Sequence, residues 1–202
     1  MLGFYERLGK RLLDVVASVF LGVLLLPLLL AIGIALELTM GPPVVFRQQR
    51  VGRNGDLFTI LKFRTMLTDR RRNDDADYSG PERRKVHKSP NDPRVTALGR
   101  LLRKWSLDEL PQLWNVLRGD MSLVGPRPEL IAIVQGYEGW QNQRHAVKPG
   151  LTGLCQISGQ RNGLMHEHVD LDLKYINDLS FQTDLRLMLK TIPAVLSKSQ
   201  GC

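Results

Sequence analysis

An uncharged run of 22 residues, Val15–Leu36, constrains the fold of this chain more than any other feature. A straight helix of that length covers roughly 33 Å, enough to cross the hydrocarbon core of a bilayer. Pro27 lies at the middle of the run. Because proline lacks a backbone N–H and clashes with the preceding turn, it kinks a helix. The run therefore predicts a membrane helix that is bent at Pro27.

The charges that flank this run do not favour one orientation across a membrane. Positively charged residues mark the cytoplasmic side of membrane helices, and here they stand at both ends. A helix that enters one leaflet, bends at Pro27 and returns would leave both ends in the cytoplasm. From the residues alone, the re-entrant and the spanning arrangements are equally open. The flanking cations are Arg7, Lys10 and Arg11 before the run, and Arg47, Arg50, Arg53, Lys62 and Arg64 after it.

The whole chain is basic, with 28 Lys and Arg against 20 Asp and Glu, a net charge of +8 in 202 residues. Between Arg47 and Lys104 there are sixteen Lys and Arg and seven Asp and Glu, so this segment accounts for the net charge. An anionic partner is therefore expected: nucleic acid, lipid headgroups or a phosphorylated metabolite. Cys155 and Cys202 are too few and too far apart for a disulfide framework, and reduced cytosolic surroundings are expected.

The segments after the apolar run predict an α+β fold that is mostly helical. Two β-like runs, residues 44–52 and 57–65, flank Asn54-Gly55, a strong signal for a β-hairpin. Residues 67–94 are polar and charged, and we interpret them as a long loop. Apolar residues at helical spacing recur in the later segments. The predicted helices cover residues 95–105, 129–146, 169–179 and 184–196. The last of them is amphipathic, interrupted by Pro193, and suited to the core, the more common outcome, or to a membrane surface.

The segment Ser106–Glu129 contains an adjacent carboxylate pair, Asp108 and Glu109, among cations. One interpretation is a helix capping box, with Ser106 as the N-cap and Glu109 three residues later. Pro111 weakens it, because a proline five residues after the cap would forfeit a helical hydrogen bond. A helix that starts near Pro111 instead leaves both carboxylates just ahead of its positive end, where phosphate is also favoured. A functional site is therefore slightly favoured over a capping box.

Several cations stand close to this pair or are candidates to join it. Arg103 precedes Asp108 by five residues, and Arg127 lies between two prolines that stiffen its backbone. A rigidly held arginine suits bidentate binding of phosphate. Arg118 and Asp120 lie nearby in the sequence. Lys62 lies on one face of the second β-run, where a solvated side chain on an ordinary amphipathic strand is the slightly favoured interpretation.

The glycine-rich and histidine-rich segments do not match known nucleotide or zinc motifs. Residues 148–153 and 159–163 contain neither GxxxxGK[ST] nor GxGxxG, so we interpret them as turns. The sequence His166-Glu167-His168 lacks a third ligand nearby, and we expect no zinc site there.

Taken together, the motifs resemble the small monotopic phosphoglycosyl transferases, the bacterial sugar transferases of the polyprenyl-phosphate pathway. The resemblance covers about residues 10–192, and the motifs stand in the order found in the family. The central motif is the most specific of them. The motifs are KRLLDVVAS, VFRQQRVG, FTILKFRTM, LGRLLRKWSLDELPQLWNVLRGDMSLVGPRPE, KPGLTGLCQISG and DLDLKYINDLSFQTDLRLMLKT.

This resemblance implies transfer of a sugar-1-phosphate from a UDP-sugar to polyprenyl (undecaprenyl) phosphate, with Mg²⁺ and with release of UMP. It implies that Asp108 is the nucleophile of a covalent phosphosugar intermediate and that Glu109 is its partner. Asp108 and Glu109 are the expected Mg²⁺ ligands, and help in deprotonating the acceptor phosphate is an alternative role for Glu109. Lys62, Arg103 and Arg127 stand at positions that bind substrate phosphate in the family. The product would start a surface glycan such as an exopolysaccharide.

The resemblance also implies where the protein works. Residues 1–40 would form a re-entrant membrane helix broken at Pro27, and residues 41–202 a globular cytoplasmic catalytic domain with amphipathic surface helices. The expected location is the cytoplasmic face of the bacterial inner membrane, with membrane lipids as partners, no nucleic acid, and a homodimer as one option. The rival interpretation is a membrane-anchored basic adaptor that binds anionic lipid or nucleic acid without catalysis. Such an adaptor would not need Asp108 and Glu109 beside Arg127.

Overall fold

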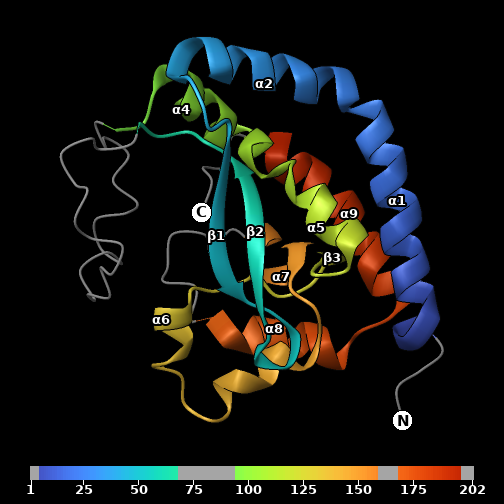
Figure 1. Ribbon diagram of the computed structural model, residues 1–202. Helices are drawn as coiled ribbons and strands as arrows, with labels where there is room; N and C mark the ends of the chain where they lie inside the picture. Colours follow the sequence, from blue (N-terminus) through green and yellow to red (C-terminus); the bar gives the residue numbers. More distant parts are fainter. Residues whose placement is uncertain (1–4, 68–93, 159–167, 197–202) are drawn as a thin grey trace.

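The computed structural model describes residues 5–67, 94–158 and 168–196. Most of these residues are helical, and a two-stranded antiparallel hairpin stands near the centre of the view in Figure 1. A bent pair of helices, α1 and α2, runs along one side and over the top of the remaining elements. The predicted α+β class, mostly helical with a small hairpin, is confirmed. The predicted charged loop, residues 67–94, lies almost wholly outside the described residues.

The apolar run forms α1 (Lys10–Leu24) and α2 (Leu26–Met40), which follow a π-helical turn at Tyr5–Gly9. The two helices are bent by 62° at Leu25. Pro27 lies in the first turn of α2, where a helix does not need its N–H. The predicted kink is thus found two residues before the proline. Among the described residues no single helix is long and apolar enough to cross a membrane, whereas this bent pair together meets the criteria of length and composition.

The predicted hairpin is confirmed. Strands β1 (Val45–Val51) and β2 (Leu57–Phe63) pair antiparallel over their whole length. The connection contains a 3-10 turn in which Asn54 has a φ of 55° and Gly55 a φ of 86°. Gly adopts positive φ at no steric cost, and Asn does so at little cost. These two residues therefore fix the turn, and with it the register that places Lys62 on β2.

The other helical elements pack around the hairpin and against α1. They are α4 (Ala97–Lys104), η3 (Leu107–Glu109), α5 (Gln112–Arg118), α6 (Ile131–Val134), η4 (Gln141–Ala146), α7 (Leu154–Ile157), α8 (Val169–Asn177) and α9 (Phe181–Leu196). The helices predicted near residues 95–105, 169–179 and 184–196 are confirmed as α4, α8 and α9.

The continuous helix predicted over residues 129–146 is wrong, because only α6 and the 3-10 turn η4 form there. Glu129 is extended and forms a β-bridge with Val51. Gly136 and Gly139 stand between the two helical pieces, and glycine is a poor helix former. Apolar spacing alone therefore overestimates the helix in this segment.

A strand also lies in the segment that we interpret from sequence as a turn. β3 (Ser122–Val124) and β4 (Gly150–Thr152) pair in parallel. A Cβ on Gly150 would lie 2.1 Å from the backbone nitrogen of Gly125, so only glycine allows this approach. Each strand has three residues, too few for a period-2 pattern to be visible in the sequence.

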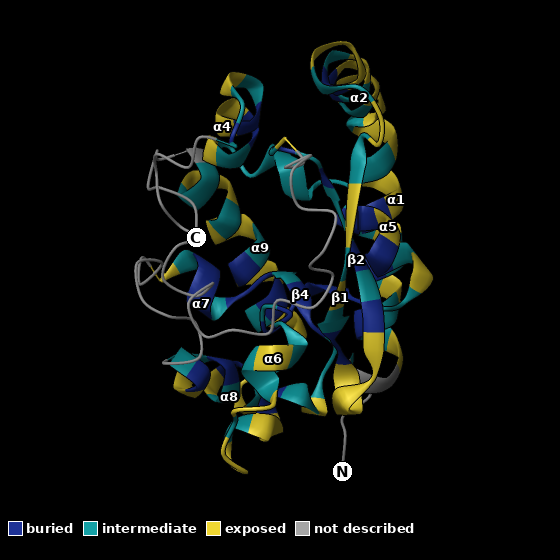
Figure 2. Cartoon of the chain, turned by 60° about the vertical axis from the view of Figure 1, so that its left-hand side comes forward, coloured by how far each residue is buried: buried dark blue, intermediate teal, exposed yellow. Residues whose placement is uncertain are grey.

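The main hydrophobic core lies between the hairpin, α5, β3 and the C-terminal helices, and Figure 2 marks the buried segments of the chain in dark blue. A second, smaller cluster joins α2 to α4 and the end of β2. The main core contains Phe58, Ile60, Leu113, Val116, Met121, Leu123, Val124, Tyr175 and Leu187. The smaller cluster contains Ile32, Leu36, Phe63 and Leu102.

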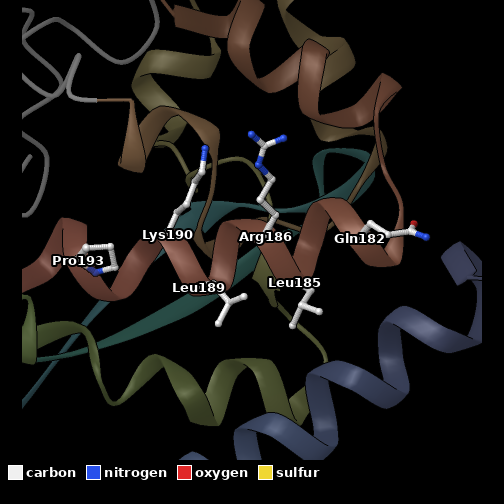
Figure 3. Close-up of a pocket in the computed structure, with 6 residues that line it drawn as sticks. All are labelled: Gln182, Leu185, Arg186, Leu189, Lys190 and Pro193. Atoms are coloured by element: carbon white, nitrogen blue, oxygen red, sulfur yellow. The ribbon is translucent and has the colours of Figure 1, made fainter.

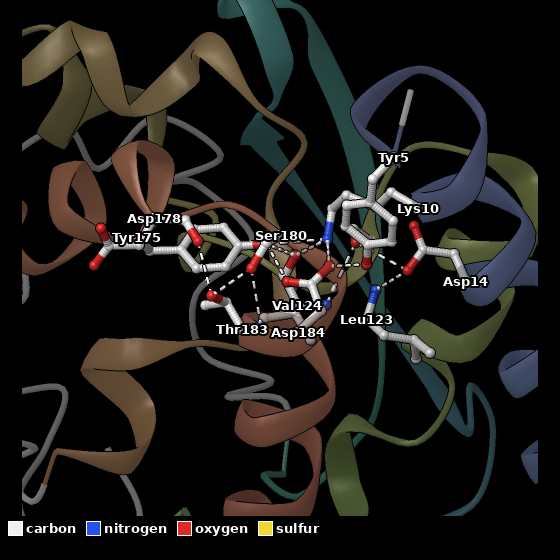
Figure 4. A network of polar contacts seen from close by, with 11 residues as sticks. Tyr5, Lys10, Asp14, Leu123, Val124, Tyr175, Asp178, Ser180, Thr183 and Asp184 are labelled. Carbon is white, nitrogen blue, oxygen red and sulfur yellow. Dashed lines mark hydrogen bonds and ion pairs between the residues drawn. The ribbon is translucent and has the colours of Figure 1, made fainter. Parts of the chain in front are cut away.

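Buried polar contacts attach the first turns of α1 to the globular part of the protein (Figure 4). The Lys10 ammonium donates to Oδ2 of Asp184, on α9, at 2.6 Å. The hydroxyl of Tyr175, on α8, donates to the other oxygen of Asp184 at 2.7 Å. One turn further along α1, Asp14 accepts from the backbone N–H of Leu123 at 2.9 Å. The apolar helix pair is therefore built into the domain rather than tethered to it.

The far end of the helix pair is held as well. Arg64, which follows β2, donates to the carbonyl oxygens of Met40, Gly41 and Pro42 at the end of α2. A cation near a helix C-terminus satisfies carbonyl groups that have no partner within the helix. Arg64 therefore caps α2, although the period-2 rule places it on the same face as Lys62.

Candidate active site

Asp108 and Glu109 lie on the 3-10 turn η3, between α4 and α5. Ser106, just before the turn, has a φ of 54°, and its side chain makes no capping hydrogen bond. Helix α5 begins at Gln112, with Pro111 at its N-cap position. The capping-box interpretation is therefore wrong, and the alternative, a helix that starts near Pro111, is confirmed.

Glu109 is held by two of the predicted phosphate-binding cations. Its Oε1 accepts from Lys62 Nζ at 2.6 Å and from Arg127 Nη2 at 2.8 Å. The three side chains are between 15% and 22% exposed, so solvent screens these contacts only weakly. Burial alone would raise the pKa of Glu109, but the two positive charges and their hydrogen bonds outweigh it and lower the pKa to about 2. Glu109 is thus ionised and fixed in place.

Asp108 differs from its neighbour, because its carboxylate makes no hydrogen bond or ion pair with any described residue. Burial is the main cause that raises the pKa of Asp108, and the charge of Glu109 adds to it. Three cations partly oppose this shift: Lys62, Arg103 and Arg127. When ionised, a carboxylate of raised basicity is a better nucleophile than an ordinary one. Of the pair, Asp108 is the member with oxygen atoms available for chemistry.

Lys62 owes its position to α5 as well as to its own strand. The side-chain amide of Asn115 accepts from the backbone N–H of Leu61 at 3.0 Å and donates to the carbonyl of Thr59 at 2.7 Å. Asn115 is 1% exposed and thus takes the place of a neighbouring strand at the outer edge of β2. The element that follows the carboxylates therefore also holds the lysine. Burial lowers the pKa of Lys62, and the charge of Glu109 opposes this.

Arg103 lies apart from the cluster at Glu109. It comes from the last turn of α4, and its Nε donates to Thr65 Oγ1 at 2.8 Å. Its charge still reaches Asp108, whose pKa it lowers. The structure therefore brings Lys62 and Arg127 together and leaves Arg103 as a separate cation near Asp108.

The backbone of Arg127 is fixed by a residue that sequence reasoning missed. Arg144, on η4, is 2% exposed, and its Nη2 donates to the Arg127 carbonyl at 2.9 Å. The same guanidinium pairs with Asp172 of α8 at 2.6 Å and donates to the Tyr137 hydroxyl at 2.6 Å. No local pattern links Arg144 to Asp172, which lies 28 residues further along the chain. Only the tertiary fold reveals this contact.

Arg118 and Asp120 do not join the site, although their place in the sequence indicated it. Arg118 Nε lies 3.3 Å from Asp120, at the opposite end of α5 from the carboxylate pair. Arg11 of α1 donates there to the carbonyls of Val116 and Leu117. Arg118 and Arg11 therefore lie at the C-terminus of α5, and Arg11 joins this end of α5 to α1.

The comparison with known families agrees with this geometry. The sequence profile of the family described as "Bacterial sugar transferase" matches residues 5–198, nearly the whole chain. The chain belongs to the bacterial sugar transferase family. The match includes both the carboxylate pair and the bent helices that precede it.

Several curated proteins are similar to this bacterial sugar transferase. The UDP-glucose:undecaprenyl-phosphate glucose-1-phosphate transferase of Caulobacter vibrioides is 44% identical, over 94% of this chain and 70% of that protein. The exopolysaccharide production protein ExoY of Sinorhizobium fredii is 39% identical, over 93% of this chain and 85% of that protein. The galactosyl transferase CpsE of Streptococcus agalactiae is 40% identical, over 96% of this chain and 43% of that protein.

The chain thus spans most of some relatives and less than half of others. The predicted family and its enzyme class, a phosphoglycosyl transferase, are confirmed. One relative is named for glucose and another for galactose, so membership of the bacterial sugar transferases does not identify the sugar.

Proposed function

We propose that this protein transfers a sugar-1-phosphate from a UDP-sugar to polyprenyl (undecaprenyl) phosphate in two steps, through a covalent intermediate on Asp108. The observation that carries the proposal is the contrast within the carboxylate pair. Glu109 is engaged by two cations, at 2.6 and 2.8 Å, whereas Asp108 feels the charges of Lys62, Arg103 and Arg127 without pairing with any described residue. The names of the relatives support both substrates.

In the first step, a carboxylate oxygen of Asp108 forms a bond to the sugar-linked phosphorus of the UDP-sugar. The bond from that phosphorus to the bridging oxygen breaks, and its electron pair leaves with UMP. Because a diphosphate repels a carboxylate, nearby cations must offset its charge. Lys62, Arg103 and Arg127 are the cations that this site provides.

In the second step, an oxygen of the acceptor phosphate forms a bond to the same phosphorus, and the bond to Asp108 breaks. This step releases polyprenyl-diphosphate-sugar and restores the carboxylate. A phosphate monoester is already largely ionised at neutral pH, so no strong base is needed to activate it. Glu109, with its lowered pKa, is a weak base. Its contacts support a role in holding Lys62 and Arg127 in place.

The carboxylate pair fits Mg²⁺ only together with oxygen atoms of a substrate. Among the described residues no group of three or more His, Cys, Asp or Glu side chains could hold a metal ion. Mg²⁺ is commonly bound by one or two carboxylates, with phosphate oxygens and water completing the octahedron. We therefore propose Asp108 and the second oxygen of Glu109 as its protein ligands when a diphosphate is bound. The ion would offset negative charge on the diphosphate.

We further propose that α1 and α2 form a re-entrant element in the cytoplasmic leaflet of the bacterial inner membrane. Lys10 attaches one end of the helix pair to the globular body, and Arg64 attaches the other end. Both ends would therefore lie on the same side of the membrane as the globular body. The outer faces of both helices carry exposed apolar side chains. They include Leu12, Val16, Phe20, Val23, Leu30, Ile34 and Leu38.

Helix α9 supports contact with the membrane surface. Leu185 and Leu189 project from one side of the helix, and Arg186 and Lys190 from another (Figure 3). Both leucines are exposed, at 41% and 60%. Apolar side chains on one face with cations beside them are typical of a helix that lies in the lipid interface. A substrate with a lipid tail could be reached from such a position.

Fluorescent labels on exposed leucines test the membrane proposal. With a lipid quencher confined to the leaflet that faces the globular domain, labels at Leu12 and at Leu38 should both be quenched if the pair is re-entrant. A label at Leu57, which is also exposed but lies on the hairpin, should not be quenched. Quenching at only one of the two helix positions would indicate a spanning helix and contradict the proposal.

Release of UMP from a panel of UDP-sugars tests the activity itself. Protein in vesicles with polyprenyl phosphate should release UMP continuously from at least one UDP-sugar. Without the acceptor, the same sugar should give a burst of about one UMP per enzyme, because the covalent intermediate accumulates. Binding of nucleic acid or anionic lipid that weakens steeply with salt, without turnover of any sugar, would favour the adaptor instead.

A further inference from the structure

A small polar cavity lies beside Glu109 and contains side chains that have no role in the mechanism described above. Its volume is about 20 Å³, room for one water molecule or for one oxygen atom of a larger group. Lys62, Glu109 and Arg127 line one part of it. Arg50 of β1 and Gln112, the first residue of α5, line another.

Arg50 and Gln112 both carry a buried donor without an acceptor. Nε of Arg50 and Nε2 of Gln112 have no hydrogen-bond partner among the described residues. Gln112 is only 2% exposed, so solvent does not satisfy its amide. Buried donors of this kind are rare in folded proteins, and each one calls for a ligand or an ordered water. Two of them at one cavity indicate that the cavity receives an acceptor.

The charge of the cavity indicates what kind of acceptor it receives. Three cations and one carboxylate line it, so positive charge is in excess. The hydrogen-bond partners of Arg50 are neutral: Gln48 Oε1 at 2.7 Å and the Pro128 carbonyl at 3.4 Å, while the charges of Glu129 and Glu109 act on it without a hydrogen bond. Burial lowers the pKa of Arg50 to about 10, which still leaves it charged at neutral pH. A charged arginine that is half-buried, has neutral hydrogen-bond partners and has a buried Nε without an acceptor favours an anion.

We propose that Arg50 and Gln112 form a subsite for the phosphate group of a phosphate monoester, the UMP that leaves in the first step. This inference rests on the proposed function. The cavity is lined by Glu109 and not by Asp108. A phosphate held there is therefore not the phosphate whose phosphorus atom Asp108 attacks. As the bond to the bridging oxygen breaks, the phosphate of UMP gains one negative charge, which Arg50 stabilises in a site of low dielectric.

The same subsite would serve the second substrate. In an in-line displacement the leaving group departs on the side opposite the nucleophile. Asp108 is the nucleophile in one step and the leaving group in the other, so the acceptor phosphate must approach from the side on which UMP departs. UMP and polyprenyl phosphate are both phosphate monoesters, and the experiment must distinguish them.

Dissociation constants for UMP and for uridine isolate the contribution of the phosphate group. Wild-type protein should bind UMP much more tightly than uridine. Arg50→Gln should reduce this preference by about tenfold or more, with uridine binding unchanged, because only the phosphate contact is lost. Arg47→Gln is the matched control, since Arg47 is exposed on the same strand; its preference should stay within about twofold of wild type. Unchanged uridine binding also shows that the variant is folded.

Gln112→Met provides a second variant of similar shape that lacks the amide donor, and it should reduce the preference several-fold. For the acceptor, the ratio of the dissociation constants of a short-chain polyprenyl phosphate and of the corresponding alcohol measures the contribution of the phosphate group in the same way. Loss of either phosphate preference in Arg50→Gln supports the subsite and identifies which monoester occupies it. If wild type prefers both phosphates and Arg50→Gln retains both preferences, the subsite is disproved while the proposed function stands. If wild type binds UMP no better than uridine, the proposed function itself fails.

Discussion

Replacing Asp108 by Asn should abolish the release of UMP from a UDP-sugar, with a fall of at least about a thousand-fold in the rate. Asn has nearly the same shape, so the turn η3 and the cations around it should stay in place. The amide cannot form the bond to phosphorus that the carboxylate forms. Both the burst without acceptor and the steady release with acceptor should therefore disappear, as measured by UMP produced in vesicles.

The matched control for this variant is Asp170→Asn. Asp170 is an exposed carboxylate on α8, away from the site, and its loss should change the rate by less than about threefold. Release of UMP by Asp108→Asn at the rate of the wild type would show that Asp108 is not the nucleophile. Glu109 would then have to be reconsidered, although both cations contact its Oε1.

Replacing Lys10 by Met should destabilise the protein by about 3–5 kcal/mol, because it leaves the buried Asp184 without its cation. Lys10 is 9% exposed and Asp184 is fully buried, so water cannot compensate for the lost partner. The hydroxyl of Tyr175 would still donate to Asp184 but would not neutralise it. The free energy of unfolding, measured by denaturant titration in detergent micelles, gives the magnitude.

Lys174→Met makes the same chemical change at an exposed position on α8, next to Tyr175 in the sequence. It should change the free energy of unfolding by no more than about 0.5 kcal/mol. Equal effects of the two variants would mean that the contact between α1 and α9 does not stabilise the fold. The conclusion that the bent helix pair is built into the domain would then be wrong.

The parts of the fold that the sequence predicted are those with strong local signals. Asn54 and Gly55 adopt the positive φ values that their hairpin turn requires. Pro27 breaks the apolar helix, and Pro111 precedes the start of α5. Helix α9 follows its amphipathic pattern, but the predicted interruption at Pro193 is wrong, because Pro193 lies inside the helix. In the other cases the chemistry of one or two residues decides the local backbone.

The features that sequence reasoning missed depend on contacts between distant segments. β3 and β4 are three residues each, and only the close approach of Gly125 and Gly150 reveals their pairing. Gly136 and Gly139 interrupt the helix that apolar spacing predicts over residues 129–146. Arg144 contacts Asp172 and the backbone of Arg127 across long stretches of chain. Contacts between residues so far apart in the chain leave no periodic pattern in the sequence from which they could be predicted.

The candidate site was predictable in its residues but not in its arrangement. Asp108, Glu109, Lys62 and Arg127 do meet, yet the two carboxylates have different surroundings. Adjacent acidic residues look equivalent in a sequence, and only the fold shows which one the cations hold. Arg103 is separate because its guanidinium contacts Thr65.

The most direct test of the central claim is the intact mass of the protein after incubation with a UDP-sugar and no acceptor. The mass should increase by one sugar phosphate per enzyme, together with the release of one UMP. Fragmentation should place the added mass on Asp108, and addition of polyprenyl phosphate should remove it. Release of UMP only when the acceptor is present, with no mass added at any stage, would show direct transfer and contradict the covalent mechanism. An adduct on any other residue would contradict the assignment of Asp108.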